Sequence, residues 1–392
     1  MNRIIVAKQL AKQKANNPTE NKLPTSVVKP EIIESKPTNN QMLVPSGPYS
    51  YTLFFEDKGY PHSVNITKLY FRYSIQNLKQ EKIIYLSTGH SFAESKYKTN
   101  FNTELISTPK IHDIFTISDK NIFYSLDNGF DDFCLIHFDN KNLLRDNFLQ
   151  IKNELYPVKS VCRNMNIKFL ENELLLKNGH NTGESYSKAI INFETDAYLT
   201  TKNNKNTYYS FKINGQVVLI SSKFPSGIVV KGISSSLSQY NNEPVTQSKI
   251  NEIFEYYFLS ILKEFKHHEL FQNIEIEPDI KKYWTNYKLN NCLSIVTLMG
   301  DSGAGFFRML DKNDLEFVGI NIGSCPMIIL SESNIKNNSN KLLWDESIGK
   351  LRLGKYIIDE IHRGSQLLPI NQIEELINRN LPMSIRVNEI TV

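Results

Sequence analysis

Cysteine is scarce in this chain, and its arrangement excludes two common kinds of site. The four cysteines, Cys134, Cys162, Cys292 and Cys325, are far apart, and none forms a Cys-x-x-Cys pair. Structural zinc sites and dithiol redox sites need such pairs, so we expect neither. The chain also has too few cysteines for a disulfide framework, so we expect a reducing compartment such as the cytoplasm. Cys134, Cys292 and Cys325 lie in or beside apolar runs and are expected to be buried as small hydrophobic side chains.

Long hydrophobic runs are also missing. No stretch approaches the ~20 apolar residues that cross a bilayer, so we expect no membrane span. The first residues are basic, but their apolar run is too short for a secretory signal. We interpret them as a short helix or a frayed tail, and an organelle-targeting or membrane-touching helix is the alternative. A non-secretory protein of this kind stays in a reducing compartment or enters a host cell by a non-classical route.

Neither sign of charge dominates. The chain has 45 Lys and Arg against 41 Asp and Glu, which gives a net charge of +4. It has no basic stripe with interleaved aromatic residues, so we expect no nucleic-acid partner. Hydrophobic residues make up 40% and charged residues 22%, as is typical of a globular protein. A length of 392 residues exceeds one ordinary core, so we expect two or three domains or one elaborated domain.

The residue composition of the chain changes near residue 49. Residues 15–47 are polar with scattered prolines, which predicts a flexible arm. Beyond the arm, short apolar and aromatic runs alternate with turn residues at spacings typical of a β-sandwich or β-barrel. The strand-like runs fill three blocks: residues 49–140, 189–230 and 293–330.

One helix interrupts this pattern inside a segment that we place at residues 246–288. Apolar residues recur there at i, i+3, i+4 and i+7, and Pro244 and Ser248 are suitable start signals. The stripe comprises Ile250, Ile253, Phe254, Tyr257, Phe258, Ile261, Leu262 and Phe265. We expect it to pack against the core, and a partner-binding face is the alternative. Two short helices are expected later, near residues 355–362 and 371–379.

The end of the apolar run 293–299 carries the strongest chemical signal. Gly300, Asp301, Ser302 and Gly303 follow that run directly. A serine hydroxyl becomes a good nucleophile only when a base removes its proton. The base needs a third group to orient it, and the oxyanion needs backbone N–H donors. A functional Ser302 therefore predicts a histidine and a carboxylate, each at the end of another strand.

Two strand ends offer those groups. His90 follows an apolar strand and the small residues Ser87, Thr88 and Gly89, which let other groups approach closely. Asp132 directly precedes the apolar run 133–136, where a carboxylate can be half-buried and face an imidazole. Its neighbour Asp131 is an alternative, although Asp132 has the better register with the strand.

Two other clusters look less suitable for chemistry. Ser185 lies between polar residues, and no apolar strand leads into it. His267, His268 and Glu269 do not have the spacing of a metal site, and we expect them on a solvated face. We therefore expect neither a metal nor another cofactor.

These blocks resemble the chymotrypsin-like (trypsin-like) serine peptidases. Residues 87–90, Ser-Thr-Gly-His, are similar to the family's Thr-Ala-Ala-His, and residues 132–136, Asp-Phe-Cys-Leu-Ile, to Asp-Ile-Ala-Leu-Leu. Residues 300–305, Gly-Asp-Ser-Gly-Ala-Gly, are similar to Gly-Asp-Ser-Gly-Gly-Pro. The order His, Asp, Ser is that of the chymotrypsin template, whereas other Ser-His-Asp folds use other orders. The similarity covers residues 50–140 and 290–330.

The resemblance implies an all-β fold. It comprises two antiparallel six-stranded β-barrels with an α-helical insertion and a short helical C-terminal tail. The implied domains are a polar arm (1–48), a first barrel with His90 and Asp132 (49–150), a second barrel with Ser302 (151–332) and a C-terminal extension (333–392).

The resemblance also implies a role for each matched residue. Ser302 would be the nucleophile, His90 the general base and then the acid, and Asp132 the group that orients His90. The N–H groups of Gly300 and Ser302 would form the oxyanion hole. The implied substrate-binding residues are Val296, Asn321 and Gly323. The implied activity is that of a serine endopeptidase, acting through an acyl-enzyme on a restricted set of protein or peptide substrates, with its own chain as a further candidate.

Several departures from the family pattern refine these expectations. The activating Ile-Val-Gly-Gly start is absent near residue 49, so Asp301 needs another cation or other hydrogen-bond donors. Val296 stands where the family sets its specificity, which argues against a preference for Lys or Arg and favours an apolar or small side chain. The interval between Asp132 and Ser302 is longer than in the template by roughly 80 residues. We expect the helical insertion to narrow the cleft.

Two other classes of function remain open. A catalytically inactive peptidase-fold binding or structural module would explain the altered Ala304 and Gly305, but it has no need for an intact His90, Asp132 and Ser302. An unrelated β-rich assembly protein would carry its Gly-Asp-Ser-Gly by chance. That last hypothesis predicts that His90 and Ser302 lie far apart.

Overall fold

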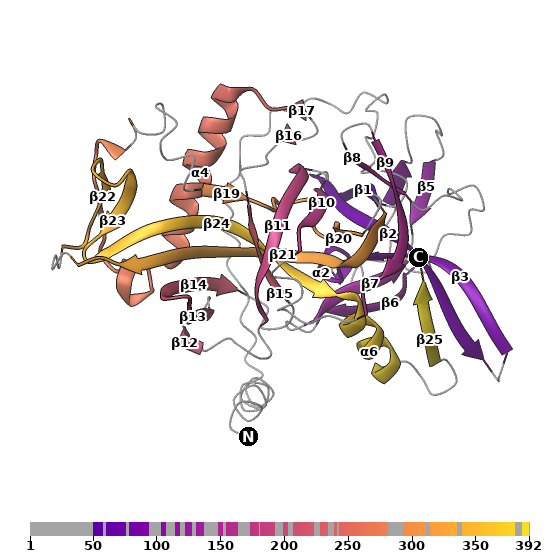
Figure 1. Cartoon of the computed structure of the whole chain (residues 1–392). Coiled ribbons are helices and arrows are strands. Elements are labelled where there is room, and N and C mark those ends of the chain that lie inside the picture. Colours follow the sequence, from indigo (N-terminus) through magenta and orange to yellow (C-terminus); the bar gives the residue numbers. More distant parts are fainter. Residues whose placement is uncertain are drawn as a thin grey trace, which may run out of the picture. The chain divides into compact units, whose positions relative to one another are not determined.

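The structure, a computed structural model, shows a protein built mainly of β-strands (Figure 1). It describes residues 50–57, 60–75, 78–93, 103–106, 114–117, 122–127, 131–136, 148–151, 154–163, 173–179, 181–192, 199–202, 207–222, 228–233, 239–240, 243–280, 282, 293–310, 314–334, 339–380 and 386–391. The chain divides into two units, 1–42 and 43–392, and every described residue belongs to the second. The arm expected over residues 1–48 lies outside the described residues. The all-β class is confirmed.

The first sheet has the strand order β1-β2-β3-β7-β6, with β25 added on β2. Its strands are β1 (Ser50–Asp57), β2 (Tyr60–Ile75), β3 (Leu78–Ser87), β6 (Ile122–Asp127), β7 (Asp132–Ile136) and β25 (Arg386–Thr391). The strands β3 and β7 pair antiparallel, with Leu86 opposite Leu135 and Ser87 opposite Cys134. This register brings the end of β3 beside the start of β7. The short helix α2 (His90–Ala93) follows β3 after two residues.

The second sheet contains a closed ring of six antiparallel strands. Pairing runs from β21 through β20, β10, β11, β15 and β24, and β24 pairs back to β21. These strands are β10 (Leu175–Gly179), β11 (Gly183–Asn192), β15 (Ile228–Gly232), β20 (Gly305–Met309), β21 (Leu315–Glu332) and β24 (Tyr356–Pro369). One buried cluster takes side chains from all six strands: Leu175, Ala189, Ile228, Val230, Phe306, Val318 and Leu367.

Further strands extend this sheet beyond the ring. β14 (Gln216–Ser222) pairs with β21 and continues into β13 (Thr207–Ile213) and β12 (Leu199–Lys202). β23 (Lys350–Leu353), β22 (Lys341–Asp345) and β18 (Glu275–Ile276) continue from β24, which also pairs in parallel with β19 (Leu293–Ile295). β9 (Glu154–Val161) pairs with β21 and with β8 (Phe148–Ile151). Two separate pairs are β4 (Thr103–Ile106) with β5 (Ile114–Ile117) and β16 (Gln239–Tyr240) with β17 (Glu243–Pro244).

A shared hydrophobic cluster packs the first sheet against the ring. Leu86 of β3 and Phe133 of β7 lie in it together with Ile320 of β21 and Ile373 of α6 (Ile370–Asn380). All four side chains are fully buried. Burying a side chain of this size stabilises the fold by about 1.5–3 kcal/mol. Strand β3, which is followed by His90, and strand β7, which begins at Asp132, are therefore fixed against the ring. Ser302 lies just before β20 of that ring.

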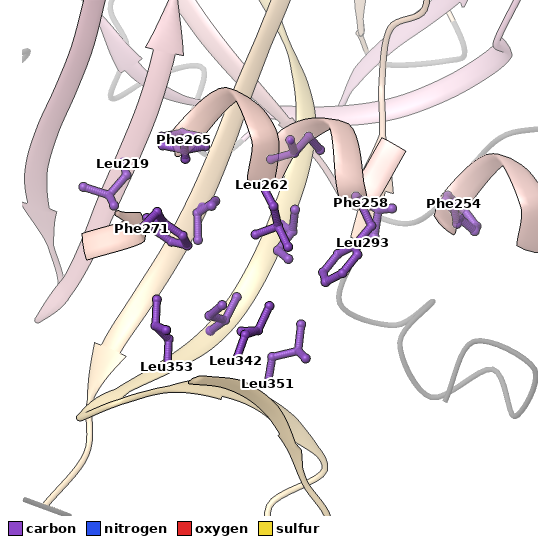
Figure 2. Packing of buried hydrophobic residues seen from close by; sticks show 14 of the residues in the cluster. Leu219, Phe254, Phe258, Leu262, Phe265, Phe271, Leu293, Leu342, Leu351 and Leu353 are labelled. Atoms are coloured by element: carbon purple, nitrogen blue, oxygen red, sulfur yellow. The ribbon is translucent and has the colours of Figure 1, made fainter. Parts of the chain in front are cut away.

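Helix α4 (Gln247–Phe265) lies within the expected insertion and buries the predicted stripe. Thr246 caps it by accepting a hydrogen bond from the N–H of Lys249. Figure 2 shows Phe258 and Leu262 of this helix, with Phe271 of the 3-10 turn η3 (Glu269–Phe271), packed over the hairpin β22–β23. The prediction that the stripe belongs to a hydrophobic core is confirmed.

His268 corrects one expectation about this segment. It was expected on a solvated face, but it is buried beside Tyr208 and accepts a hydrogen bond from the N–H of Leu270. Burial also lowers the pKa of His268, although nearby Glu269 opposes that shift. His268 is thus buried in a core that sequence periodicity alone does not reveal.

The helix expected near residues 355–362 is wrong, because this segment is part of strand β24. Its apolar residues fit either a helix or a strand, and pairing with β21 on one side and with β23 or β19 on the other decides for the strand. The helix expected at 371–379 is present as α6. The residues expected as a C-terminal extension supply strands to both sheets, β24 to the ring and β25 to β2.

Three of the four cysteines lie among the described residues, and all are buried free thiols: Cys134, Cys162 and Cys325. Burial raises the pKa of Cys134 and of Cys325, and the charges of Asp132 and Glu264 respectively raise them further. Both thiols are therefore held neutral, as expected of small hydrophobic side chains. Cys292 lies outside the described residues.

Candidate active site

His90 and Asp132 are in direct contact. The backbone N–H of His90 donates to Oδ1 of Asp132 at 2.7 Å, and its ring Nδ1 is hydrogen-bonded to Oδ2. The Asp132 side chain is fully buried, whereas 40% of the His90 side chain is exposed. Because the carboxylate engages Nδ1, Nε2 is the ring nitrogen left to accept or donate a proton.

Asp131, the alternative partner, has a different contact. Its Oδ1 accepts a hydrogen bond from Nε2 of Gln372 on α6 at 2.9 Å. The two neighbouring carboxylates are thus divided between two elements: Asp132 holds His90, and Asp131 contacts the C-terminal helix.

The loop that carries Ser302 is held against the first sheet by Asn65 of β2. The backbone N–H of Asn65 donates to the carbonyl of Ser302 at 2.8 Å, and its Nδ2 donates to the carbonyl of Gly300 at 3.0 Å. The carbonyl of Asn65 accepts from the hydroxyl of Ser87 at 2.7 Å. Since Ser87 lies three residues before His90, this chain of contacts runs from the serine loop to the strand end that carries the histidine.

The hydroxyl of Ser302 is not hydrogen-bonded to His90 in the part of the chain that the structure describes. Ser302 itself is partly exposed. Hydrogen bonds between a nucleophile and its base are often long or absent without substrate and form only in the reacting complex. The described contacts therefore bring His90 and Asp132 together and place the Ser302 backbone against the same sheet.

Gly303 makes this close approach possible. Its φ is +82°, a conformation that favours glycine, and a Cβ atom here would lie 2.1 Å from the carbonyl oxygen of Asn65. The same atom would lie 2.6 Å from Oγ of Ser87. A side chain at this position would push the serine loop away from β2 and β3.

We expect Gly303→Ala to lower the free energy of unfolding by about 2–4 kcal/mol, because strain and overpacking add at this position. Gly215→Ala is the matched control, since Gly215 has φ +83° but nothing within 4 Å of the added Cβ. It should cost about 1 kcal/mol from backbone strain alone. Urea denaturation of both variants measures the difference, and equal losses would contradict the tight contact with Asn65.

Two backbone N–H groups of the serine loop make no hydrogen bond to any described residue. The N–H of Asp301 donates to the carbonyl of Leu298, and that of Gly303 donates to the carbonyl of Asn321. Across the described residues, no hydrogen-bond acceptor faces the N–H groups of Gly300 and Ser302. Unpaired backbone donors are rare in folded proteins. A pair of them beside a serine can stabilise a negatively charged oxygen.

The side chain of Asp301 is fully buried, and its cation is Lys177 of β10. The Lys177 ammonium lies 3.3 Å from Oδ2, which also accepts from the Thr182 hydroxyl at 2.7 Å and the N–H of Leu298 at 2.9 Å. Oδ1 accepts from the N–H of Asn181 at 2.8 Å and that of Thr182 at 3.3 Å. Burial lowers the pKa of Lys177, and the charge of Asp301 opposes this shift.

The residues expected to bind substrate lie near this loop. Val296 is fully buried in the cluster inside the ring. Asn321 is buried; its Nδ2 donates to the carbonyl of Asp301 at 2.9 Å, and its Oδ1 accepts from the Ser365 hydroxyl at 2.5 Å. Gly323 is partly exposed. Asn321 thus ties β21 to the serine loop.

The sequence did not single out Asn65, Lys177 or Thr182. Asn65 is one polar position in an alternating strand, and Lys177 follows a short run of leucines before a turn, so neither stands out. A charged residue at a strand position that is otherwise apolar is a weak signal for Lys177. Ser185, judged unsuitable, is buried and donates to the carbonyl of Lys177 at 3.4 Å.

Among the described residues, no group of three or more His, Cys, Asp and Glu side chains could hold a metal ion. Nor does any described helix have the length and apolarity that crossing a bilayer requires.

Comparisons with known proteins do not assign the chain to a family. No protein-family model matches the chain. No curated protein matches it. One solved structure, of "a glutamic acid specific serine protease" that "utilizes a novel histidine triad in substrate binding", is similar at 10% identity. The match covers 52% of this chain and 95% of that one, with a TM-score of 0.23. So distant a likeness carries no argument, and the candidate site depends on the contacts described above.

Proposed function

We propose that this protein is a serine endopeptidase in which His90, Asp132 and Ser302 act together. The observation that carries the proposal is the buried carboxylate of Asp132, which binds both the backbone N–H and the ring Nδ1 of a partly exposed histidine. A buried carboxylate in this position orients an imidazole and stabilises its protonated form. The serine loop, held by Asn65 against the same sheet, supplies the nucleophile.

The proposed reaction has two halves. The oxygen of Ser302 attacks the peptide carbonyl carbon while Nε2 of His90 takes the hydroxyl proton. The N–H groups of Gly300 and Ser302 bind the oxyanion, and the C–N bond breaks as His90 gives its proton to the departing amine. Water then attacks the acyl-enzyme by the same route and releases the acid and free Ser302. These steps use only groups of this chain and water.

The proposed architecture follows from the sheets. We propose that the closed ring is the second barrel of a chymotrypsin-like pair and that the first sheet belongs to the first barrel. The proposed substrate is a peptide bond in a restricted set of proteins, and α4 supports that restriction because it packs on β21 and β24 near the ring. Cleavage of the protein's own chain belongs to the same proposal.

Labelling with a fluorophosphonate probe tests this function. The folded protein should form a covalent adduct, and mass spectrometry of peptides should locate it on Ser302, because an ordinary serine does not react at a useful rate. Heat-denatured protein is the control and should not react. A folded protein without an adduct, or with its adduct on another residue, would contradict the proposal and favour a catalytically inactive module.

A further inference from the structure

The wall of the ring next to the serine loop carries two polar side chains on one face. In the antiparallel pair β21–β24, Ser324 lies opposite Ser365, and Pro326 lies opposite Arg363. Side chains two residues apart on a strand point to the same face, so Ser324 and Arg363 share a face. Figure 1 shows β21 and β24 running side by side, with α4 across them.

This face is continuous with the serine loop. Ser324 follows Gly323, and the hydroxyl of Ser365 bonds to Asn321, which in turn bonds to the carbonyl of Asp301. The carbonyl of Arg363 accepts from the N–H of Val296 at 3.0 Å, at the start of the segment that leads to Ser302. The wall is therefore joined by hydrogen bonds to Asp301 and to Val296, which lie one and six residues before Ser302.

Both polar side chains have unused hydrogen-bonding groups. Oγ of Ser324 and Nε of Arg363 are buried atoms that have no hydrogen-bond partner among the described residues. The guanidinium of Arg363 lies 4.8 Å from the ring centre of Tyr257 and 3.7 Å from a carboxylate oxygen of Glu264, both on α4. That second distance is too long for a hydrogen bond. The Arg363 side chain as a whole is 19% exposed, so it is not sealed from solvent, although its Nε is buried.

Unpaired donors of a partly buried guanidinium are costly, and a carboxylate satisfies two of them at once. Arginine recognises a carboxylate in this way because its N–H groups form a planar fork. Val296, by contrast, is fully buried inside the ring. The partly exposed side chains of this wall, Arg363 and Ser324, are therefore cationic and polar.

Building on the proposed peptidase function, we propose that Arg363 and Ser324 select substrates with Asp or Glu immediately before the cleaved bond. Arg363 donates to the substrate carboxylate, and the Ser324 hydroxyl donates a further hydrogen bond. The Glu264 carboxylate lies 3.7 Å from the Arg363 guanidinium and therefore competes with the substrate carboxylate for it. This proposal replaces the apolar or small preference that Val296 suggested.

The proposal is tested with peptide diphenyl phosphonates, in which phosphorus replaces the carbonyl carbon at the cleaved bond. The probes differ only in the side chain of the residue that carries the phosphonate. The wild-type protein should react with the Glu probe about 100-fold faster than with the Leu probe, because a site built for hydrogen bonds rejects a ligand that lacks them. The Lys probe should be slower still. Arg363→Met should bring the Glu-to-Leu ratio close to one, and Arg363→Lys should keep part of it. Thermal unfolding shows whether each variant is folded.

Two further variants distinguish recognition from simple structural damage. Ser324→Ala should reduce the Glu-to-Leu ratio by a smaller factor, about 10-fold, because it removes one hydrogen bond. Glu264→Gln should raise the ratio, since it removes the competing carboxylate. A structural role for Arg363 in the Glu264 pair predicts instead that both Arg363→Met and Glu264→Gln slow all probes alike, which would overturn the proposal.

The wild-type results distinguish failure of the acidic specificity from failure of the peptidase function. A wild-type protein that reacts fastest with the Leu or Lys probe would disprove acidic specificity and leave the peptidase function standing. A folded protein that reacts with no probe, fluorophosphonate included, would disprove the peptidase function itself.

Discussion

Asp132→Asn is expected to slow the reaction of Ser302 with a fluorophosphonate by about 10⁴-fold near pH 7, the size of effect seen for the same change in the chymotrypsin template. An asparagine can still accept the bond from the backbone N–H of His90 through its Oδ1. The amide Nδ2 of the asparagine would then face the ring Nδ1 of His90. Because Nδ2 is a hydrogen-bond donor, Nδ1 would have to be the acceptor. The ring proton would move to Nε2, which could no longer take the proton of Ser302.

The neighbouring carboxylate provides a matched control for this variant. Asp131 contacts Gln372 of α6, so Asp131→Asn should change the rate by no more than a few-fold. Ser302→Ala sets the baseline because it lacks the nucleophile. Rates are measured from the time course of labelling, with circular dichroism to verify folding. A large loss in Asp131→Asn, or none in Asp132→Asn, would show that the triad is assigned to the wrong carboxylate.

Lys177→Met is expected to lower the free energy of unfolding by about 3–5 kcal/mol, because it leaves the carboxylate of Asp301 buried without its cation. Both side chains of the pair are fully buried, so water cannot replace the lost charge. The remaining hydrogen bonds from Thr182, Asn181 and Leu298 offset only part of the loss. Because Asp301 adjoins Ser302, labelling by the fluorophosphonate should also slow markedly.

Lys350→Met is the matched control for Lys177→Met. Lys350 pairs with Asp359 on another part of the sheet, and 43% of its side chain is exposed. Asp359 is only 9% exposed but also accepts a hydrogen bond from Gln216 at 2.9 Å, so loss of the largely solvated Lys350 should cost about 1 kcal/mol. The double variant Lys177→Met, Asp301→Asn removes both charges and should regain part of the lost stability. If Lys177→Met unfolded at the same urea concentration as Lys350→Met, the buried pair would not be what holds the serine loop.

Much of the candidate site could be predicted from the sequence, because its groups follow strand ends. The apolar runs before His90 and before Gly300, and the one after Asp132, indicated strands, and small residues beside them indicated close approach. The structure places His90 and Asp132 in contact, as the choice of Asp132 over Asp131 required. The unused N–H groups of Gly300 and Ser302 lie in the loop where the sequence located the oxyanion hole.

The groups that hold the site in place could not be predicted in this way. Asn65 and Lys177 are far from Ser302 in the chain, and neither carries a local signal. They reach the serine loop only because β2 packs beside it and because β10 joins β20 in the ring. The partner of Asp301 was therefore left open in the sequence as either a cation or hydrogen-bond donors.

The sequence by itself determined the β-rich class and the helix α4, and it supplied the candidate residues of the proposed site. These features depend on short-range periodicity and on residue types within a few positions of each other. The tertiary structure decided that residues 356–369 form a strand, that His268 is buried, and that Lys177 and Asn65 hold the serine loop. Each of these outcomes depends on pairing between segments far apart in the chain, whose free energy outweighs local preference and leaves no local pattern.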